Sequence, residues 1–228
     1  DDKNIESDIM RFKADHVELV GRSSISIFIG LINKYRQSEK DIKNLLTDTS
    51  ELYNLGILLI TADTLETALD IILKEALRIL KAPAGSIALY DEKTNHLTLE
   101  ASEGFPESFS RVTRWERRKG GMTEHILGKR VPTVIHDVAE FPFVDNKVLL
   151  EAGIKSLVAL PFRANARIVG ILYIDDFQSR QWKPREIDFL ILFGVQAASA
   201  IEKFKLIEDI RDTKTYLQNV LDNSAKQW

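Results

Sequence analysis

Few residues of this chain have a type and spacing suited to chemistry. Cysteine is absent from all 228 residues, which excludes disulfides, thiolate–zinc sites, iron–sulfur clusters and a cysteine nucleophile. Of the four scattered histidines, His125 and His136 could ligate a haem iron or another metal, because imidazole is a favoured iron ligand. Neither lies in a paired motif such as His-x-x-x-His, and no carboxylate–histidine cluster is evident. We therefore expect ordinary polar roles for both, with no metal site and no haem.

An acidic pair, Asp175-Asp176, closes an apolar stretch and could bind a metal ion. A turn at the end of a strand is the better interpretation of two adjacent aspartates at this place. Ser-His-Asp, P-loop and glycine-rich nucleotide signatures are absent. We therefore predict that this stretch of chain is not itself an enzyme.

Basic and aromatic residues gather in one polar stretch and shortly after it. The arginines between Arg111 and Lys119 could bind phosphate or carboxylate groups, although solvated surface is the preferred interpretation of such a charge run. Trp115, Phe141 and Phe143 could line a pocket, because ligand sites are mostly apolar with a few polar anchors. Packing into the core explains these three aromatic residues equally well.

The composition allows a buried core and argues against two classes of partner. Hydrophobic residues make up 44% of the chain, within the globular range. The formal net charge is only -3, whereas binding nucleic acid requires a concentrated basic face. The apolar stretch 25–32 is interrupted by Ser26 and Gly30 and is far shorter than the ~20 residues that span a bilayer. We expect no nucleic-acid partner and no membrane span; the start at Asp1 indicates a piece excised from a longer protein.

Long helices are predicted at both ends of the chain. Residues 7–60 contain no proline, but Gly21 and Gly30 are expected to mark a break, and Pro184 lies in the first turn of the last helix. Both helices carry a seam at spacings of three and four residues: Ile42, Leu45, Thr49, Leu52, Gly56 and Leu59 in the first, and Leu206, Ile210, Thr213, Leu217 and Val220 in the last. Such seams favour packing against another helix, as in a coiled-coil dimer; for the first seam, packing onto its own domain is an equal alternative.

Strands and short helices are predicted between these ends. A helix capped by Asp63 and stopped by Pro83 precedes a hairpin. The further elements, in order, are strands 85–90 and 96–101, a loop at 107–120, a short helix at 121–128, a strand at 131–138, a helical turn at 147–152, and strands 156–162 and 168–174. This order favours an antiparallel sheet with helices on its faces over a parallel doubly wound fold.

Five segments in this order resemble the GAF family. GSIALYDEKTNHLTLEASEGFP resembles its opening hairpin, and KGGMTEHILGKRVPTVIHDV its glycine, short helix and strand ending in Asp-Val. AGIKSLVALPF, ARIVGILYIDD and FQSRQWKPREIDFLILFGVQAASAIE are similar to the closing strands and the final helix. The resemblance covers about Leu55 to Lys205. Beyond it, YLQNVLDNSA at 216–225 resembles the helix that introduces a PAS domain in bacterial sensor proteins.

The resemblance also narrows the chemistry. His125 and His136 fall in the segment that walls the ligand pocket of GAF relatives, whereas covalent bilin attachment and the free methionine sulfoxide reductases of this fold need a cysteine. Cyclic-nucleotide-binding relatives carry an Asn-Lys-Phe-Asp-Glu signature. The run 143–147, which contains Phe143 and Asp145, has similar residue types in the wrong order, and this argues against such a ligand. Residues 15–19, DHVEL, resemble a kinase phosphoacceptor box but lack the Arg-x-Pro that follows it in kinases.

We therefore expect an α/β (α+β) fold: a GAF/PAS-like three-layer sandwich with a central antiparallel sheet of five or six strands, helices on both faces and long terminal helices. The expected organisation is a helical segment at 1–54, a GAF domain at 55–205, and a signalling helix at 206–228 that leads to a further domain. Ligand contacts are expected at Trp115, His125, His136, Phe141, Phe143 and Asp145.

The expected function is that of a cytoplasmic sensory module. It would bind an unidentified small molecule, or relay a signal, through a homodimer of its flanking helices. The output would be a downstream PAS or histidine kinase domain of a two-component system, or a cyclic-di-GMP enzyme. The alternative is a ligand-free structural dimerisation module within a multidomain signalling protein.

Overall fold

The structure is a computed structural model that describes residues 2–106, 109, 113–129, 131–141, 147–165 and 167–225. The chain divides into two compact units, Asp1–Ser50 and Glu51–Trp228. The described residues of the first unit all belong to helix α1, which runs from Asp2 to Ile60. This helix continues through Gly21 and Gly30, so the predicted break is wrong. A glycine costs a helix only about 1 kcal/mol, which a long run of better helix formers can offset.

A six-stranded antiparallel sheet forms the centre of the second unit, and its strand order is β3-β2-β1-β6-β5-β4. The strands are β1 (Ala84–Asp91), β2 (His96–Glu103), β3 (Arg114–Glu116), β4 (Thr133–Ile135), β5 (Ser156–Ala164) and β6 (Arg167–Asp176). The predicted hairpins β1–β2 and β5–β6 are both present. The two hairpins join through antiparallel pairing of β1 with β6, so that these two strands lie at the middle of the sheet.

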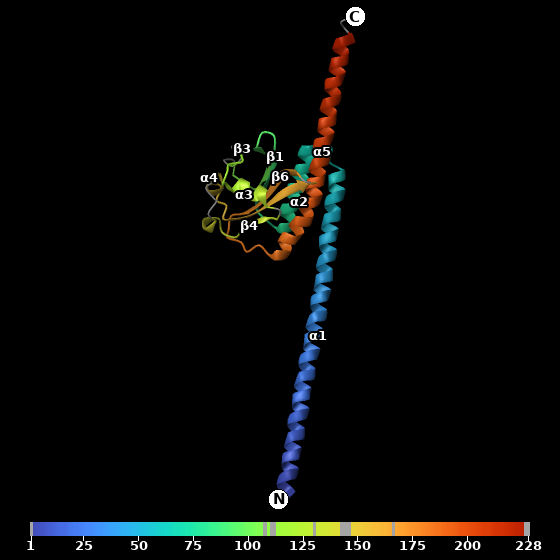
Figure 1. Cartoon of the computed structure of the whole chain (residues 1–228), viewed down its shortest axis with the longest axis vertical. Coiled ribbons are helices and arrows are strands. Elements are labelled where there is room, and N and C mark those ends of the chain that lie inside the picture. Colours follow the sequence, from blue (N-terminus) through green and yellow to red (C-terminus); the bar gives the residue numbers. More distant parts are fainter. Residues whose placement is uncertain are drawn as a thin grey trace. The chain divides into compact units, whose positions relative to one another are not determined.

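Helices cover both faces of the sheet, which confirms the predicted three-layer arrangement. Figure 1 shows α2 (Leu65–Leu80) and α5 (Pro184–Ala225) on one side, with α3 (Met122–Gly128) and α4 (Lys147–Glu151) on the other. The first side is the larger core and includes Leu55, Leu69, Ile72, Leu172, Phe193 and Ile201. The second core includes Leu97, Ile126, Leu127, Leu149, Leu157 and Ile171. From Ile171 to Ile174, successive residues of β6 alternate between the two cores, as expected for a strand that is buried on both faces.

The ends of α2 differ from their predictions by small local effects. The N-cap is Thr64 and not Asp63: Thr64 is extended, and its hydroxyl accepts a hydrogen bond from the Thr67 backbone N–H at 3.1 Å. At the other end, Lys81 adopts a left-handed conformation with φ of 51°, and its N–H donates to the carbonyls of Leu77 and Arg78. The helix therefore ends at Leu80, before Pro83 is reached.

Two edge strands also differ from the predictions. β3 lies within the stretch predicted to be a loop at 107–120 and pairs with residues 96–98 of β2. β4 is shorter than the predicted strand at 131–138, because the chain turns into the 3-10 helix η2 (Val138–Glu140). Asp137 caps η2, and its Oδ1 accepts a hydrogen bond from the Ala139 N–H at 2.9 Å.

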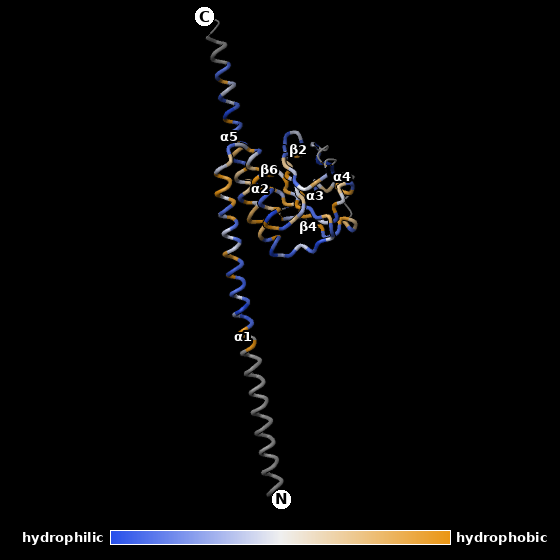
Figure 2. Tube along the Cα trace, turned by 180° about the vertical axis from the view of Figure 1, so that it is seen from behind, coloured by the Kyte–Doolittle hydropathy of each residue, from blue (hydrophilic) through white to orange (hydrophobic). Residues whose placement is uncertain are grey.

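Helix α5 belongs partly to the core and partly to the surface. Its residues from Phe189 to Phe204 include seven apolar residues that are buried in the larger core, whereas Leu206, Ile210 and Leu217 are exposed. The predicted final helix and its extension are thus one continuous helix. Figure 2 shows its last part as mainly hydrophilic, with hydrophobic positions at intervals.

Gly170→Ala should disrupt the centre of the sheet. A Cβ at this position of β6 would lie 2.6 Å from the Ala88 carbonyl oxygen of β1, so the paired backbones would have to separate. We expect the free energy of unfolding, measured by urea denaturation, to fall by about 1–3 kcal/mol. The control is Gly128→Ala, where nothing lies within 4 Å of the added Cβ. Equal stability of the two variants would contradict the observed β1–β6 register.

Candidate functional site

The sheet surface beneath α3 and α4 contains an unusual concentration of buried polar groups. This surface, here called the α3/α4 face, comprises Ser86, Ala88, Thr133, Ile135, Leu157, Ala159, Ile171, Tyr173 and Asp175. Only four polar or charged residues are counted as buried among those described, and three of them, Ser86, Thr133 and Asp175, lie on this face. They point the same way as the apolar members because side chains two residues apart on a strand share a face.

Register places these groups in two adjacent rows across the sheet. One row runs through Ser86, Tyr173, Ala159 and Thr133 on strands β1, β6, β5 and β4. The neighbouring row runs through Ala84, Asp175, Leu157 and Ile135. Directly opposed residues on antiparallel strands have Cβ atoms about 4.5–5.5 Å apart. Asp175 therefore lies among short or apolar side chains, next to the Tyr173 row.

Asp175 is the most unusual group of the α3/α4 face. Its side chain is 1% exposed, and its Oδ1 has no hydrogen-bond partner among the described residues. Burial raises the pKa of the Asp175 carboxyl well above its ordinary value, and no neighbouring charge opposes this shift. Burial, together with the nearby Asp175, also raises the pKa of the Tyr173 phenol. The Oγ1 of Thr133 is likewise buried without a partner within the described part of the chain.

Helix α3 connects this face to the edge strand β3. Thr123 in its first turn accepts a hydrogen bond from Trp115 Nε1 at 3.3 Å, and its interaction with Tyr173 opposes the rise in the pKa of that phenol. Glu124 accepts a hydrogen bond from the Gly120 N–H at 2.6 Å and pairs with Arg117 at 3.3 Å. The Gly120 N–H, followed by Arg117, holds the pKa of the Glu124 carboxyl below its ordinary value. The basic stretch is thus tied to the first turn of α3 through Arg117.

The predicted ligand contacts divide into three groups. Trp115 and Phe141 are half-buried against the core of the α3/α4 face, and His125 lies edge-on to Phe141 with ring centroids 6.0 Å apart. Burial lowers the pKa of the His125 imidazole. His136 is exposed and belongs to a different cluster, because the alternation of β4 turns it away from Ile135. Phe143, Asp145 and Arg111 lie outside the described residues.

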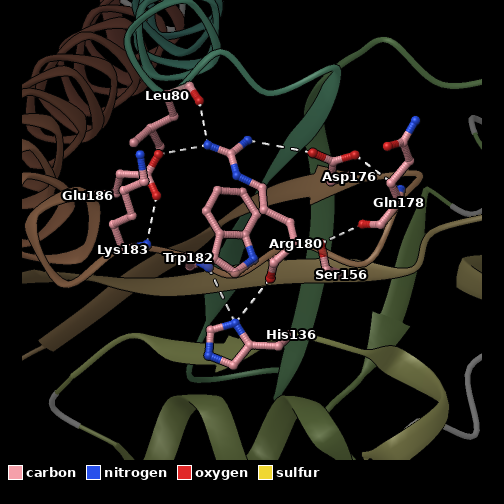
Figure 3. Close-up of polar contacts among 9 residues, drawn as sticks. All are labelled: Leu80, His136, Ser156, Asp176, Gln178, Arg180, Trp182, Lys183 and Glu186. Atoms are coloured by element: carbon pink, nitrogen blue, oxygen red, sulfur yellow. Dashed lines mark hydrogen bonds and ion pairs between the residues drawn. The ribbon is translucent and has the colours of Figure 1, made fainter.

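That second cluster surrounds Arg180 and is here called the Arg180 junction: Leu80, His136, Asp176, Arg180, Trp182 and Glu186 (Figure 3). The guanidinium donates to the Leu80 carbonyl at the end of α2 and to Glu186 Oε1 in the first turn of α5, both at 2.8 Å. It also lies 3.5 Å from Asp176 Oδ2 at the end of β6 and 4.0 Å from the ring centre of Trp182.

Backbone contacts join β4 to the Arg180 junction. The Arg180 N–H donates to the His136 carbonyl at 3.3 Å, and Nδ1 of His136 lies 3.0 Å from the Arg180 carbonyl. The Ser179 hydroxyl donates to Oδ2 of Asp137, the residue that follows His136. Glu186 also accepts a hydrogen bond from the Lys183 N–H at 2.8 Å, in the manner of a capping box at the start of α5. The segment that leads into η2 is thereby connected to the first turn of α5.

A family model of the GAF domain matches residues 62–202, which is more than half of the chain. This chain belongs to the GAF family. GAF domains are often sensory or signalling modules of larger proteins. No curated protein matches the sequence. Within the described residues, no helix has both the length and the apolar character needed to cross a membrane, and no three His, Asp or Glu side chains are grouped so as to hold a metal ion.

Solved structures of similar fold come from several kinds of protein. The GAF domain of a phosphoenolpyruvate-protein phosphotransferase from Coxiella burnetii is 19% identical, with a TM-score of 0.62 over 72% of this chain and 98% of its own. Free methionine-R-sulfoxide reductase from Neisseria meningitidis, solved with its substrate, is 16% identical, with a TM-score of 0.59 over 72% and 93%. The GAF domain of a protein assigned as a sensor histidine kinase from Pseudomonas syringae pathovar tomato is 18% identical, with a TM-score of 0.55 over 78% and 98%. At these identities the likeness shows the fold alone.

Sequence reasoning missed two groups, Asp175 on the α3/α4 face and Arg180 at the Arg180 junction. The turn interpretation is supported for Asp176, whose Oδ1 accepts a hydrogen bond from the Gln178 N–H at 3.0 Å, but not for Asp175. The available signal was strand phase: Asp175 follows Ile171 and Tyr173 at intervals of two residues and must share their face. The residues next to Arg180 in the sequence did not indicate its role, because its partner Leu80 lies 100 residues away.

The stability of the GAF domain should decrease as the pH rises above the ordinary pKa of aspartate. The folded state holds the Asp175 proton more tightly than the unfolded chain does, so the unfolded state binds fewer protons and stability falls until the raised pKa is passed. Asp175→Asn removes this dependence. Urea denaturation across a pH series should show a stability advantage of the variant that grows with pH, reaching about 1–3 kcal/mol. An advantage that stays constant with pH would contradict the burial of an unpaired acid.

Arg180→Ala should weaken the attachment of α5. The substitution leaves Glu186, Asp176 and the Leu80 carbonyl without their shared donor, and all three lie in partly buried surroundings. We expect thermal or urea denaturation to show a loss of about 2–3 kcal/mol. The control is Arg78→Ala, which breaks contacts with Glu51 and Glu75 at a side chain that is 52% exposed and should cost less than about 1 kcal/mol. Similar losses in both variants would indicate that the junction has no special structural role.

Proposed function

We propose that this GAF domain is a cytoplasmic sensory module that binds a small molecule at the α3/α4 face and relays its occupancy through α5 to a downstream output domain. The observation that carries the proposal is the Arg180 junction. It connects the segment at the edge of the ligand face, His136 and Asp137, with the first turn of a helix that continues without a break to Ala225. A binding event that moves this segment therefore has a hydrogen-bonded route to α5.

The route can transmit a signal only if the ligand distinguishes two arrangements. A ligand shifts an equilibrium by no more than its difference in affinity for the two states. Trp115 and Phe141 pack against the core of the α3/α4 face, with His125 beside Phe141, and these side chains are suited to contact a ligand in one arrangement more than in the other. We infer that occupancy displaces the segment from His136 to Phe141, and that the junction passes this displacement to α5.

The exposed seam of α5 is the surface through which the signal would leave the domain. Leu206, Ile210 and Leu217 are 55%, 67% and 54% exposed and recur at spacings typical of a helix–helix contact. They share one exposed side of α5 with Thr213 and the charged residues Asp209 and Lys214. We propose that this seam pairs with its copy in a parallel homodimer and leads to a PAS-type or histidine kinase domain.

The exposed seam also supports a second function. An apolar stripe of this kind requires a partner whether or not the domain binds a small molecule. A structural dimerisation module without a ligand would use the same residues. Only the presence of a ligand separates the two functions.

Native mass spectrometry of the purified chain tests both functions. We expect the mass of a dimer carrying a small adduct under gentle conditions, and the bare chain mass after denaturation. A dimer without any adduct would favour the structural module, whereas a monomer would contradict the paired seam.

The double variant Leu206→Ala/Ile210→Ala locates the dimer contact. It should weaken the dimer at least about tenfold, because even 1.4 kcal/mol of lost contact energy has that effect. The matched control, Asp212→Ala/Thr215→Ala, places two alanines on the opposite side of the same helix and should leave the dimer intact. In the full-length protein, unchanged signalling by the seam variant would contradict the relay.

A further inference from the structure

We propose that Asp175 is the polar anchor of the ligand site and that the ligand is a small organic cation, such as a protonated amine, amidine or guanidine. The inference rests on the proposed function, because it takes the α3/α4 face as the ligand site. It adds the chemical class of the ligand and the residue that selects it.

The first argument is the isolation of the Asp175 carboxyl group. A fully buried aspartate is rare unless it is paired with a cation or satisfied by hydrogen bonds. Asp175 is 1% exposed, its Oδ1 has no partner among the described residues, and the residues paired with it on β1 and β5 are Ala84 and Leu157. These side chains offer no donor, so the fold itself does not explain the acid.

The second argument is the absence of a resident cation. No charged neighbour among the described residues contributes to the raised pKa of Asp175; burial alone accounts for it. The nearby Arg180, which could have served, lies on the opposite side of the sheet and is shared between Asp176 and Glu186. A bound cation would supply the missing partner and favour the ionised carboxylate, whereas a bound anion would find no opposite charge at this position.

The surroundings of Asp175 also suit an organic cation better than a metal ion. No group of three His, Asp or Glu side chains is present in the described part of the chain, as a metal site would need. Aromatic rings are available instead: Tyr173 and Phe177 flank Asp175 at intervals of two residues, and both belong to the core of the α3/α4 face. The faces of aromatic rings attract ammonium and guanidinium groups.

Proton release accompanies the binding step. Burial raises the pKa of the Asp175 carboxyl, so that below this raised pKa the unliganded group retains its proton. When a cation with an N–H donor binds, the carboxyl loses this proton to solvent, and the resulting carboxylate accepts a hydrogen bond from the ligand nitrogen. The ligand remains protonated throughout. Binding should therefore release up to one proton per ligand and strengthen as the pH rises.

A thermal-shift experiment on the full 228-residue chain tests the class of ligand. The cationic probes are ethylammonium, methylguanidinium and benzamidinium; benzamide and benzoate are the neutral and anionic counterparts of the last. We expect at least one cation to raise Tm by about 3–5 °C at a tenfold excess over its Kd, with no comparable effect of benzamide or benzoate. Calorimetry in two buffers of different ionisation enthalpy should show the released proton.

Two neighbouring substitutions make the test specific. Asp175→Asn keeps the shape of the side chain but removes the charge, and it should abolish the cation-dependent shift. Asp176→Asn makes the same chemical change on the opposite face of the sheet and should retain that shift. A cation effect that is equal in both variants, or that involves no proton release in the unmodified chain, would overturn the inference. The calorimetric result holds even if Asp175→Asn does not fold.

The same measurements distinguish failure of this inference from failure of the proposed function. If native mass spectrometry shows an adduct that is equally abundant in the unmodified chain and in Asp175→Asn, the sensory function stands and the assignment of Asp175 is wrong. If the unmodified chain shows no adduct and no probe changes its Tm, both the inference and the ligand-sensing function fail.

Discussion

Strand β6 is the element on which the rest of the domain depends. It pairs with β1 on one side and β5 on the other, and its side chains enter both cores in turn. The close approach of Gly170 to the Ala88 carbonyl fixes its distance from β1. A strand in this position has no solvent-exposed side on which to place a polar residue. Any polar side chain at its centre must therefore be satisfied by the fold or by something that the fold binds.

The end of β6 shows both outcomes in adjacent residues. Asp176 points to the α2/α5 side, where Gln178 and Arg180 satisfy it, and so becomes part of the structure that starts α5. Asp175 points to the α3/α4 side, where no described residue satisfies its Oδ1. One strand thus carries a structural acid on one face and a candidate binding acid on the other. The α3/α4 face and the start of α5, which the proposed function links, meet at this strand end.

The sequence predicted the helices and strands that show a local apolar periodicity. It did not predict β3, which depends on pairing with another strand. The phase of the apolar residues in β5, β6 and α2 was visible in the sequence, and both hairpins and the three layers followed from it. β3 was missed because three residues with two exposed charges gain their strand character only by pairing with β2. Thr64 and Asp63 are both good capping residues, and the backbone conformation at Thr64 decides between them.

The candidate site was predicted in part and for a similar reason. Trp115, His125 and Phe141 were expected to contact a ligand; the structure places Trp115 and Phe141 against the core of the α3/α4 face and His125 beside Phe141, and ligand contact stays a prediction. His136 was expected there too, but a single residue of strand alternation turns it towards the Arg180 junction. Asp175 and Asp176 are chemically identical, so the sequence distinguishes their environments only through the alternation of β6, which must be followed to its last residue, Asp176.

The continuity of α5 has a mechanical consequence. Its first part is clamped between the sheet and α2, while the 20 or so residues after Lys205 form a rod about 30 Å long. A tilt of only about 5° at the clamped part would move the far end of such a rod by about 2–3 Å. In the proposed relay the helix would act as a lever: a displacement at the Arg180 junction too small to disturb the core becomes a movement of about 2–3 Å at Ala225.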